Sequence, residues 1–377
     1  MWRLALNQLK YESSRSSLTM LAISASIAMI LVLRGFEQGL YVQSESAVLD
    51  RGGQLILTQS GVSNFLAVRS SIPQLTRGEV EAVEGVTTAH PVTGFWVIYG
   101  TEENKYPLLL MVYDTLGGPT HLIEGKPIRD GRDVVIDVGL SKRFNLKPGD
   151  PLIISDYEFR VAGITSGSSA MFSTFVFVSY DGMIDFFLES EVAPDISTFP
   201  LLSYLLVETE EGVTPEVVAK RIEQQVSAVD VYLPQELANN DVALGEELFG
   251  PIMNVLIILS YIIGMLVIGL IIYSDVGLRR RNYAVMKALG FSQLKIAKGI
   301  IAQTSILVLF SFPSGVLLAY LAAKGIEVNM PVYLVQIIDA SGLAKVFLGV
   351  VVMTLIGSLL PLRLIARTDP AIAFQAE

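Results

Sequence analysis

Four apolar stretches are distributed very unevenly along this chain of 377 residues, and their spacing constrains its topology more than any other feature. One lies near the N-terminus at residues 18–33, and three are crowded between residues 251 and 362. A helix of about 20 apolar residues spans a bilayer core of about 30 Å with all its backbone groups paired internally. The sequence therefore predicts a membrane protein with a long polar interval after its first span.

The three C-terminal stretches are long enough to span a membrane. Residues 251–273 and 299–323 carry no charged side chain, and residues 343–362 carry only Lys345. That lysine lies near one end of its stretch, where a long cationic side chain can reach the interface. We expect Pro251 to open the second span, because proline is favoured at the first helical position.

The N-terminal stretch is shorter, with 16 residues, although the small and hydroxyl residues at 13–17 can extend it by a turn. A cleaved signal peptide is the alternative to a retained helix, because Arg3, Lys10 and Arg15 precede the apolar core. Small residues suited to cleavage are not obvious beside Arg34. The retained helix is therefore favoured.

The distribution of charge predicts the orientation. Residues 1–16 hold three Lys/Arg against one acid, and residues 274–298 hold six against Asp275 alone, so both segments should be cytoplasmic. Residues 34–247 carry 14 basic and 31 acidic side chains, whereas the whole chain has a net charge of −10. This acidic interval should lie outside, and it argues against nucleic acid as a partner, since phosphate contacts need clustered cations.

The predicted fold is therefore four transmembrane α-helices, one N-terminal and three C-terminal, with a large extracytoplasmic α+β domain between the first and second. In order, the segments are a cytoplasmic segment (1–16), transmembrane helix (17–36), extracytoplasmic domain (37–247), transmembrane helix (248–273), cytoplasmic coupling helix (274–298), transmembrane helix (299–323), external loop (324–342), transmembrane helix (343–362) and cytoplasmic tail (363–377).

The external interval shows short runs rich in β-branched residues, separated by turn residues, and a few helical patterns. We expect two sub-blocks, at about 41–164 and 201–237. The expected strands are 54–58, 95–99, 107–112, 134–137, 152–155, 159–161, 174–178, 201–207 and 229–233, and the expected helices are 77–83, 139–144 and 215–226.

No catalytic or cofactor-binding constellation is evident. The chain has no cysteine, and its two histidines, His90 and His121, are predicted in loops without ligands at metal-binding spacing. Gly125-Lys126 lacks the upstream glycine and the following Ser or Thr of a phosphate-binding loop. We therefore expect a non-catalytic chain that holds no metal or cofactor.

Two pairs of small residues permit close helix approach, Ser260-x-x-x-Gly264 and Gly315-x-x-x-Ala319. Such pairs also occur by chance, so the sequence leaves open whether they mark interfaces. Pro313 should kink the third span, because it removes a backbone donor.

The strongest signal lies in the basic connection at residues 275–300. Its pattern predicts a helix with Leu278, Val285 and Leu289 on one face, ended by Gly290 and followed by a second short helix that Ser292 caps. Such a helix either lies on the membrane surface, with its cations meeting lipid headgroups, or docks into a groove of a cytoplasmic partner. The residues alone favour neither.

Residues 279–296, RRRNYAVMKALGFSQLKI, resemble the corresponding loop of FtsX-like permeases of the ABC transporter superfamily. Residues 360–374 resemble the closing signature of that family, and residues 124–164 are similar to a passage of the MacB-type periplasmic domain. Asn282 stands where the family usually has Glu, and Tyr283-Ala284 resembles a DevC-like branch. The departure affects a charge contact to the partner ATPase but leaves the hydrophobic docking implied by the resemblance, through Tyr283, Val285, Met286 and Leu289.

The resemblance implies a permease in the bacterial inner membrane, with cytoplasmic termini, that pairs with a second permease copy or paralogue and with two nucleotide-binding ATPase subunits. ATP and magnesium would bind those ATPases, and a periplasmic adaptor, an outer-membrane duct and membrane lipid are further expected partners. The residues that the resemblance assigns to ATPase coupling are Leu278, Arg279, Arg280, Asn282, Tyr283, Val285, Met286, Lys287, Leu289 and Gly290.

Motion of the ATPases would then drive the external domain by mechanotransmission, exporting or extracting a lipid, lipoprotein, peptide or antibiotic. The alternative is an FtsX-type signalling scaffold, in which the same motion activates an external hydrolase without transport. The size of the external domain favours the transporter, by analogy with the family. A membrane-anchored enzyme is disfavoured, because no catalytic constellation is evident.

Overall fold

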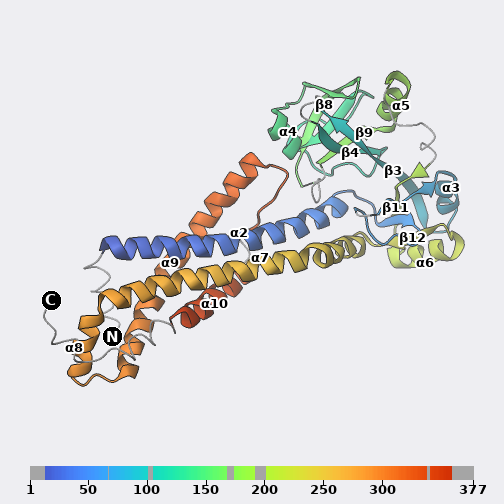
Figure 1. Ribbon diagram of the computed structural model, residues 1–377. Helices are drawn as coiled ribbons and strands as arrows, with labels where there is room; N and C mark the ends of the chain where they lie inside the picture. Colours follow the sequence, from blue (N-terminus) through green and yellow to red (C-terminus); the bar gives the residue numbers. More distant parts are fainter. Residues whose placement is uncertain are drawn as a thin grey trace. The chain divides into compact units, whose positions relative to one another are not determined.

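The computed structural model (Figure 1) describes residues 13–66, 68–100, 105–167, 174–191, 201–337 and 340–358. The chain divides into two compact units. The membrane unit comprises Met1–Gln38, Gly250–Gly325 and Val335–Glu377, and the external unit comprises Gly39–Phe249 and Ile326–Leu334. The closing signature expected at 360–374 and the tail at 363–377 lie outside the described residues.

Four helices among the described residues are long and apolar enough to cross a membrane, which confirms one N-terminal and three C-terminal spans. A fifth, shorter helix connects the second and third of them. The helices are α2 (Ser13–Leu49), α7 (Pro234–Leu278), α8 (Arg280–Ala288), α9 (Gln293–Asn329) and α10 (Ala340–Gly357).

Glycines mark the places where these helices approach most closely. A Cβ built on Gly315 of α9 would lie 2.8 Å from side-chain atoms of Ile27 in α2. The Ser24 hydroxyl of α2 donates to the Ser311 carbonyl of α9 over 3.1 Å. On α7, a Cβ at Gly264 would lie 2.9 Å from the Met353 sulfur of α10. Both small-residue pairs therefore mark interfaces within this chain.

Pro251 lies inside α7, so its expected position at the start of the second span is wrong. The helix begins at Pro234, because half of residues 235–250 are Glu, Leu or Ala, which favour helix and continue the pattern. Proline within a membrane helix is tolerated where neighbouring groups satisfy the freed backbone. α9 likewise runs through Pro313 without interruption.

The external unit is built on a sheet with ten strands among the described residues, in the order β12-β1-β11-β3-β4-β9-β6-β8-β5, with β7 beside β3 and β8. β2 (Ile72–Pro73) and β10 (Leu201–Leu202) form a separate antiparallel sheet of two strands. The ten strands are β1 (Leu55–Gln59), β3 (Val86–Tyr99), β4 (Tyr106–Tyr113), β5 (Glu124–Gly125), β6 (Asp133–Asp137), β7 (Pro151–Ile154), β8 (Tyr157–Thr165), β9 (Thr174–Ser179), β11 (Tyr204–Thr209) and β12 (Val229–Tyr232).

The expectation of two sequential sub-blocks is wrong. β1, from the first predicted block, lies between two strands of the second, with Leu55 opposite Val207 of β11 and Ile56 opposite Tyr232 of β12. Antiparallel pairing of β1 with both neighbours buries its apolar side chains on both faces. Strands from the beginning and the end of the external region therefore pair with each other and share one part of the hydrophobic core.

The helices of the external unit are α3 (Leu75–Glu81), α4 (Val138–Phe144), α5 (Tyr180–Glu189) and α6 (Pro215–Gln225). Three of them match predicted helices, whereas α5 was missed. Each strand that the sequence predicted has a counterpart in the sheet, although β3 is much longer than the predicted 95–99.

The outer ends of α2 and α7 belong to the hydrophobic core of the external unit. Ala47 and Val48 of α2, and Leu237 and Ala238 of α7, are each fully buried in a cluster that includes Phe177 of β9. These ends of α2 and α7 are therefore packed against the sheet of the external unit.

Candidate functional site

The inner end of α7 is joined to α8 by a single residue, Arg279, whose backbone leaves the helical region (φ −105°, ψ 15°). Its guanidinium lies 3.3 Å from the Asp275 carboxylate one turn earlier, and both side chains are largely buried. The Tyr283 amide donates to the Arg279 carbonyl over 3.2 Å. These contacts fix the angle at which α8 leaves α7.

One face of α8 packs into the membrane unit. Tyr283 is only 9% exposed and Ala284 is fully buried. Tyr283 lines a cavity of about 40 Å³ together with residues of α2, α7 and α9, among them Ile268 and Thr304. Burial raises the pKa of Tyr283 to about 12, so its hydroxyl is neutral at physiological pH. Tyr283 and Ala284 therefore anchor α8.

Gly290 ends α8 with φ +86°, a backbone conformation that favours glycine. The Phe291 amide donates to the Met286 carbonyl, and the Gly290 amide to the Lys287 carbonyl, each over 3.0 Å. This pair of bonds is the Schellman motif that closes a helix. The predicted end of the helix at Gly290 is therefore confirmed.

The prediction of a second short helix after Gly290 is wrong, because the helix found there is long. Ser292 does precede a helix, and its side chain accepts from the Lys295 amide over 3.4 Å. That helix is α9, which continues directly into the third predicted span. No glycine or proline interrupts residues 293–298, so nothing in this stretch stops the helix.

Large apolar side chains are also exposed around this turn. Leu278 is 70% exposed, Val285 41% and Leu289 73%. The predicted single helix that would carry all three on one face is wrong, because Leu278 is the last residue of α7 and Arg279 interrupts the helix before α8. Phe291 and Leu294, which follow Gly290, are exposed as well, and sequence reasoning missed them. We call these five residues the coupling face: Leu278, Val285, Leu289, Phe291 and Leu294.

Polar and basic side chains surround the coupling face. Asn282, Arg281, Lys295 and Lys298 are exposed. Met286 and Lys287 are half-buried, and the Arg280 side chain lies outside the described residues. Among the predicted coupling residues whose side chains the structure describes, Arg279 and Tyr283 leave the least surface for a partner, since each is only 9% exposed.

The histidines do not form a second site. His90 lies in β3 rather than in the predicted loop, and its Nε2 lies 3.1 Å from Glu208 of β11. His121 lies 3.4 Å from Asp50. In the part of the chain that the structure describes, no three His, Asp or Glu side chains gather as metal ligands would.

Comparison with known proteins gives the family. Residues 16–225 match the MacB-like periplasmic core domain, and residues 254–370 match the FtsX-like permease C-terminal domain. Uncharacterized ABC transporter permeases of Mycobacterium tuberculosis and Mycobacterium bovis are each 22% identical, with 98% of this chain and 98% of theirs aligned.

Two solved external domains also resemble part of the chain, each at 12% identity. The extracellular domain of the noncanonic ABC-type transporter YknZ from Gram-positive bacteria matches 48% of this chain and 100% of its own, with a TM-score of 0.34. The periplasmic region of MacB from Actinobacillus actinomycetemcomitans matches 51% of this chain and 94% of its own, with a TM-score of 0.36.

The first family match alone covers more than half of the chain, and the second contains α8 and the coupling face. One candidate membrane helix precedes the α+β domain and three follow it. The chain therefore belongs to the MacB/FtsX-type permeases of ABC transporters, inner-membrane proteins whose partner is an ATPase subunit.

Proposed function

We propose that the coupling face docks into a groove of the ATPase subunit and receives its motion. The observation that carries this proposal is the two-sided environment of α8. Tyr283 and Ala284 pack inward against the membrane helices, so Val285 and Leu289 point away from them. Exposed apolar side chains on the side of α8 that faces away from the membrane helices are available to a groove of a cytoplasmic partner.

Covering the coupling face supplies a driving force for association. Apolar surface removed from water contributes about 25 cal/mol per Å², and leucines more than two-thirds exposed have most of their area to bury. The exposed Arg281, Lys295 and Lys298 form a basic rim that suits an acidic partner surface. An apolar centre with a charged rim is the usual anatomy of a specific interface.

The motion would travel along α7. This helix is continuous from Pro234 to Leu278, about 68 Å at about 1.5 Å per residue. Its inner end carries the Arg279 turn, and its outer end contributes Leu237 and Ala238 to the core of the external unit. We infer that a push on α8 moves the external domain by mechanotransmission.

The loop after α9 supports the same mechanism within the external unit. Gln43 of α2 donates to the Val332 carbonyl over 2.8 Å. A Cβ on Gly139 of α4 would lie 3.2 Å from the Pro331 carbonyl oxygen. The loop that joins α9 to α10 is therefore a third connection, beside α2 and α7, between membrane helices and external fold.

We further propose that two ATPase subunits bind ATP and magnesium, and that a second permease copy or paralogue completes the transporter. We infer from the basic segments at 1–16 and 274–298 that the N-terminus and α8 are cytoplasmic, and four spans would then return the C-terminus to the same side. The external domain then works on a lipid, lipoprotein, peptide or antibiotic, with a periplasmic adaptor and an outer-membrane duct.

The docking proposal is tested with Val285→Asp combined with Leu289→Asp. Two carboxylates in the apolar face should abolish co-purification with the ATPase while membrane insertion persists. The matched control is Leu75→Asp with Leu188→Asp, two similarly exposed leucines on α3 and α5 of the external unit. ATPase binding retained by the first variant, or lost equally in the control, would contradict the proposal.

Orientation is tested with single cysteines, since the chain has none of its own. Leu75→Cys should react with an impermeant maleimide added outside intact cells, whereas Lys295→Cys should react only after the membrane is opened. Both positions are exposed, so access to the reagent depends on the compartment. Equal labelling of both from outside would overturn the assignment.

A further inference from the structure

The membrane unit holds a second cavity that the coupling site does not use. Its volume is about 300 Å³, and its walls come from α2, α7, α10 and the segment at residues 335–337. The lining combines charged, polar and apolar side chains, notably Arg34, Glu37, Tyr261, Gln336, Ile337 and Lys345. Pockets of this size and mixed lining are typical of ligand sites.

The wall formed by residues 335–337 is fixed against α2. The Gln336 amide donates to the Gly35 carbonyl over 2.8 Å. A Cβ on Gly35 would lie 3.0 Å from Ile337 and 3.1 Å from the Gln336 carbonyl oxygen, so glycine permits this close approach. Val335 and Ile337 are both buried. A backbone hydrogen bond and close packing therefore hold this wall of the cavity in place.

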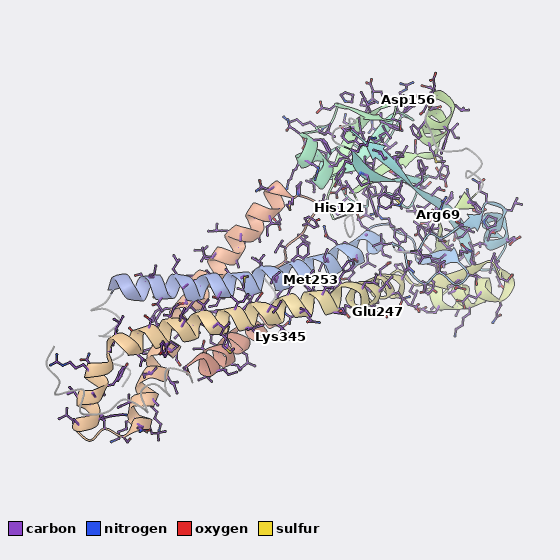
Figure 2. All side chains as sticks on the ribbon, viewed as in Figure 1. Arg69, His121, Asp156, Glu247, Met253 and Lys345 are labelled. Carbon is purple, nitrogen blue, oxygen red and sulfur yellow. The ribbon has the colours of Figure 1, made fainter. Side chains whose placement is uncertain are left out.

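The charges in the cavity do not balance. Arg34 forms an ion pair with Glu37, with an N–O distance of 2.8 Å. Lys345 also lines the cavity, and it makes no hydrogen bond or ion pair with any residue that the structure describes. Figure 2 labels Lys345 on α10. Lys345 is exposed at the edge of the cavity, so its amine is available to the phosphate of an anionic ligand.

We propose that this cavity binds the phosphate headgroup of a membrane lipid. Lys345 and Arg34 supply positive charge to the phosphate, and the Tyr261 hydroxyl is a neutral hydrogen-bond donor in the same lining. Leu31 and Val346 provide apolar wall for the start of an acyl chain. This apolar wall distinguishes a lipid from free phosphate, and basic pockets between membrane helices are known sites for lipid headgroups.

The cavity lies where the apolar stretch of α2 ends at Arg34 and where α10 begins, at Ala340. Both positions adjoin the segments that lead into the external unit. With the orientation proposed above, the lipid belongs to the outer leaflet. Lipid binding itself needs neither that orientation nor ATPase docking, so a failed docking test leaves this proposal standing.

The test compares wild-type protein, Lys345→Gln and Lys324→Gln in nanodiscs of phosphatidylcholine and phosphatidylglycerol. Lys324 is the matched control, because it is an exposed lysine near the outer end of α9, where its amine lies 6.0 Å from the Tyr320 ring. Native mass spectrometry counts the phosphatidylglycerol that each released protein retains. Lys345→Gln should retain about fivefold less than wild type, since one lysine near a lipid surface contributes about that factor.

Lys324→Gln should match wild type, and Lys345→Arg should restore retention because it keeps the charge. Equal retention by wild type and Lys345→Gln, or an equal loss in Lys324→Gln, overturns the site. A second arm measures radiolabelled inorganic phosphate on protein in phosphatidylcholine nanodiscs. We expect no saturable binding there; saturable binding that Lys345→Gln removes would assign the cavity to free phosphate and overturn the lipid proposal.

Discussion

The two ends of α7 are built differently. At the outer end, Leu237 and Ala238 are fully buried, and both oxygens of Asp241 accept backbone amides, from Phe65 at 2.8 Å and from Leu66 at 3.2 Å. At the inner end, Tyr283 and Ala284 are buried, but Leu289, the C-cap of the same short helix, is exposed. The side of α7 that meets the external core is covered at the outer end, whereas apolar side chains stay uncovered at the inner end.

This difference indicates two kinds of joint. A closed joint has its polar groups paired and its apolar groups covered, so it transmits displacement without slipping. A joint with one apolar face uncovered is completed by another molecule. The long helix therefore connects a permanent attachment in the external unit to an attachment that a partner makes. The predictions below test that distinction, beginning with the largest effect.

Ala238→Asp should have the largest effect, because it places a charge in the closed outer joint. An unpaired buried charge costs about 3–5 kcal/mol, enough to unfold the external unit around α7. Limited proteolysis of the full chain in detergent measures the loss. Asn239→Asp, at the exposed neighbouring position of the same helix, should leave the protease resistance unchanged. Equal sensitivity of the two variants would contradict a closed joint.

Local rules predicted much of the fold because they depend on neighbours in sequence. Gly290 ends α8 as its conformational freedom requires, and the apolar runs of the strands match the observed sheet. β3 is longer than the predicted strand at 95–99 and includes Pro91, a residue that is disfavoured within a sheet. Pairing with β4 begins only at Val92, so Pro91 has β11 alone as a neighbour and its missing amide is tolerated.

The long-range pairing of strands and the choice of the buried face of α8 could not be predicted from the sequence. Periodicity places Val285 and Leu289 on one face of α8, but only tertiary packing decides that Tyr283 turns inward. The position of β1 between β11 and β12 depends on contacts between strands about 150 residues apart, which no local pattern encodes. Leu294 was missed because the sequence assigned it to a separate helix capped by Ser292, and Phe291 because it lies between the two predicted helices.

Tyr283→Ala should have an intermediate effect at the inner joint. Removing the ring from its buried position enlarges the adjoining cavity and should therefore destabilise the fold. We expect a cost of about 3 kcal/mol, near the lower end of the range for aromatic truncation. α8 would then lose its anchor, so ATPase binding should weaken and ATP hydrolysis should uncouple from movement of the external domain. Cysteine crosslinking of the external domain with and without ATP measures that movement.

Tyr283→Phe is the conservative control, since it keeps the ring, and it should retain the coupling. Asn282→Ala changes the exposed neighbour and should leave the fold of α8 intact. If Tyr283→Ala bound and moved like wild type, the inner joint would not depend on its anchor. If Asn282→Ala alone failed, the partner contact would depend on the polar position instead.

Leu294→Asp should have the smallest effect on stability, less than about 0.5 kcal/mol, because the side chain is 67% exposed. Its effect on the partner decides how far the coupling face extends. If the ATPase covers the start of α9 as well as α8, this variant should bind about tenfold more weakly, since burying a leucine contributes about 1.5 kcal/mol or more. Gln293→Asp, the exposed neighbour, is the control. Unchanged binding of Leu294→Asp would confine the partner contact to Leu278, Val285 and Leu289, on the α8 side of Gly290.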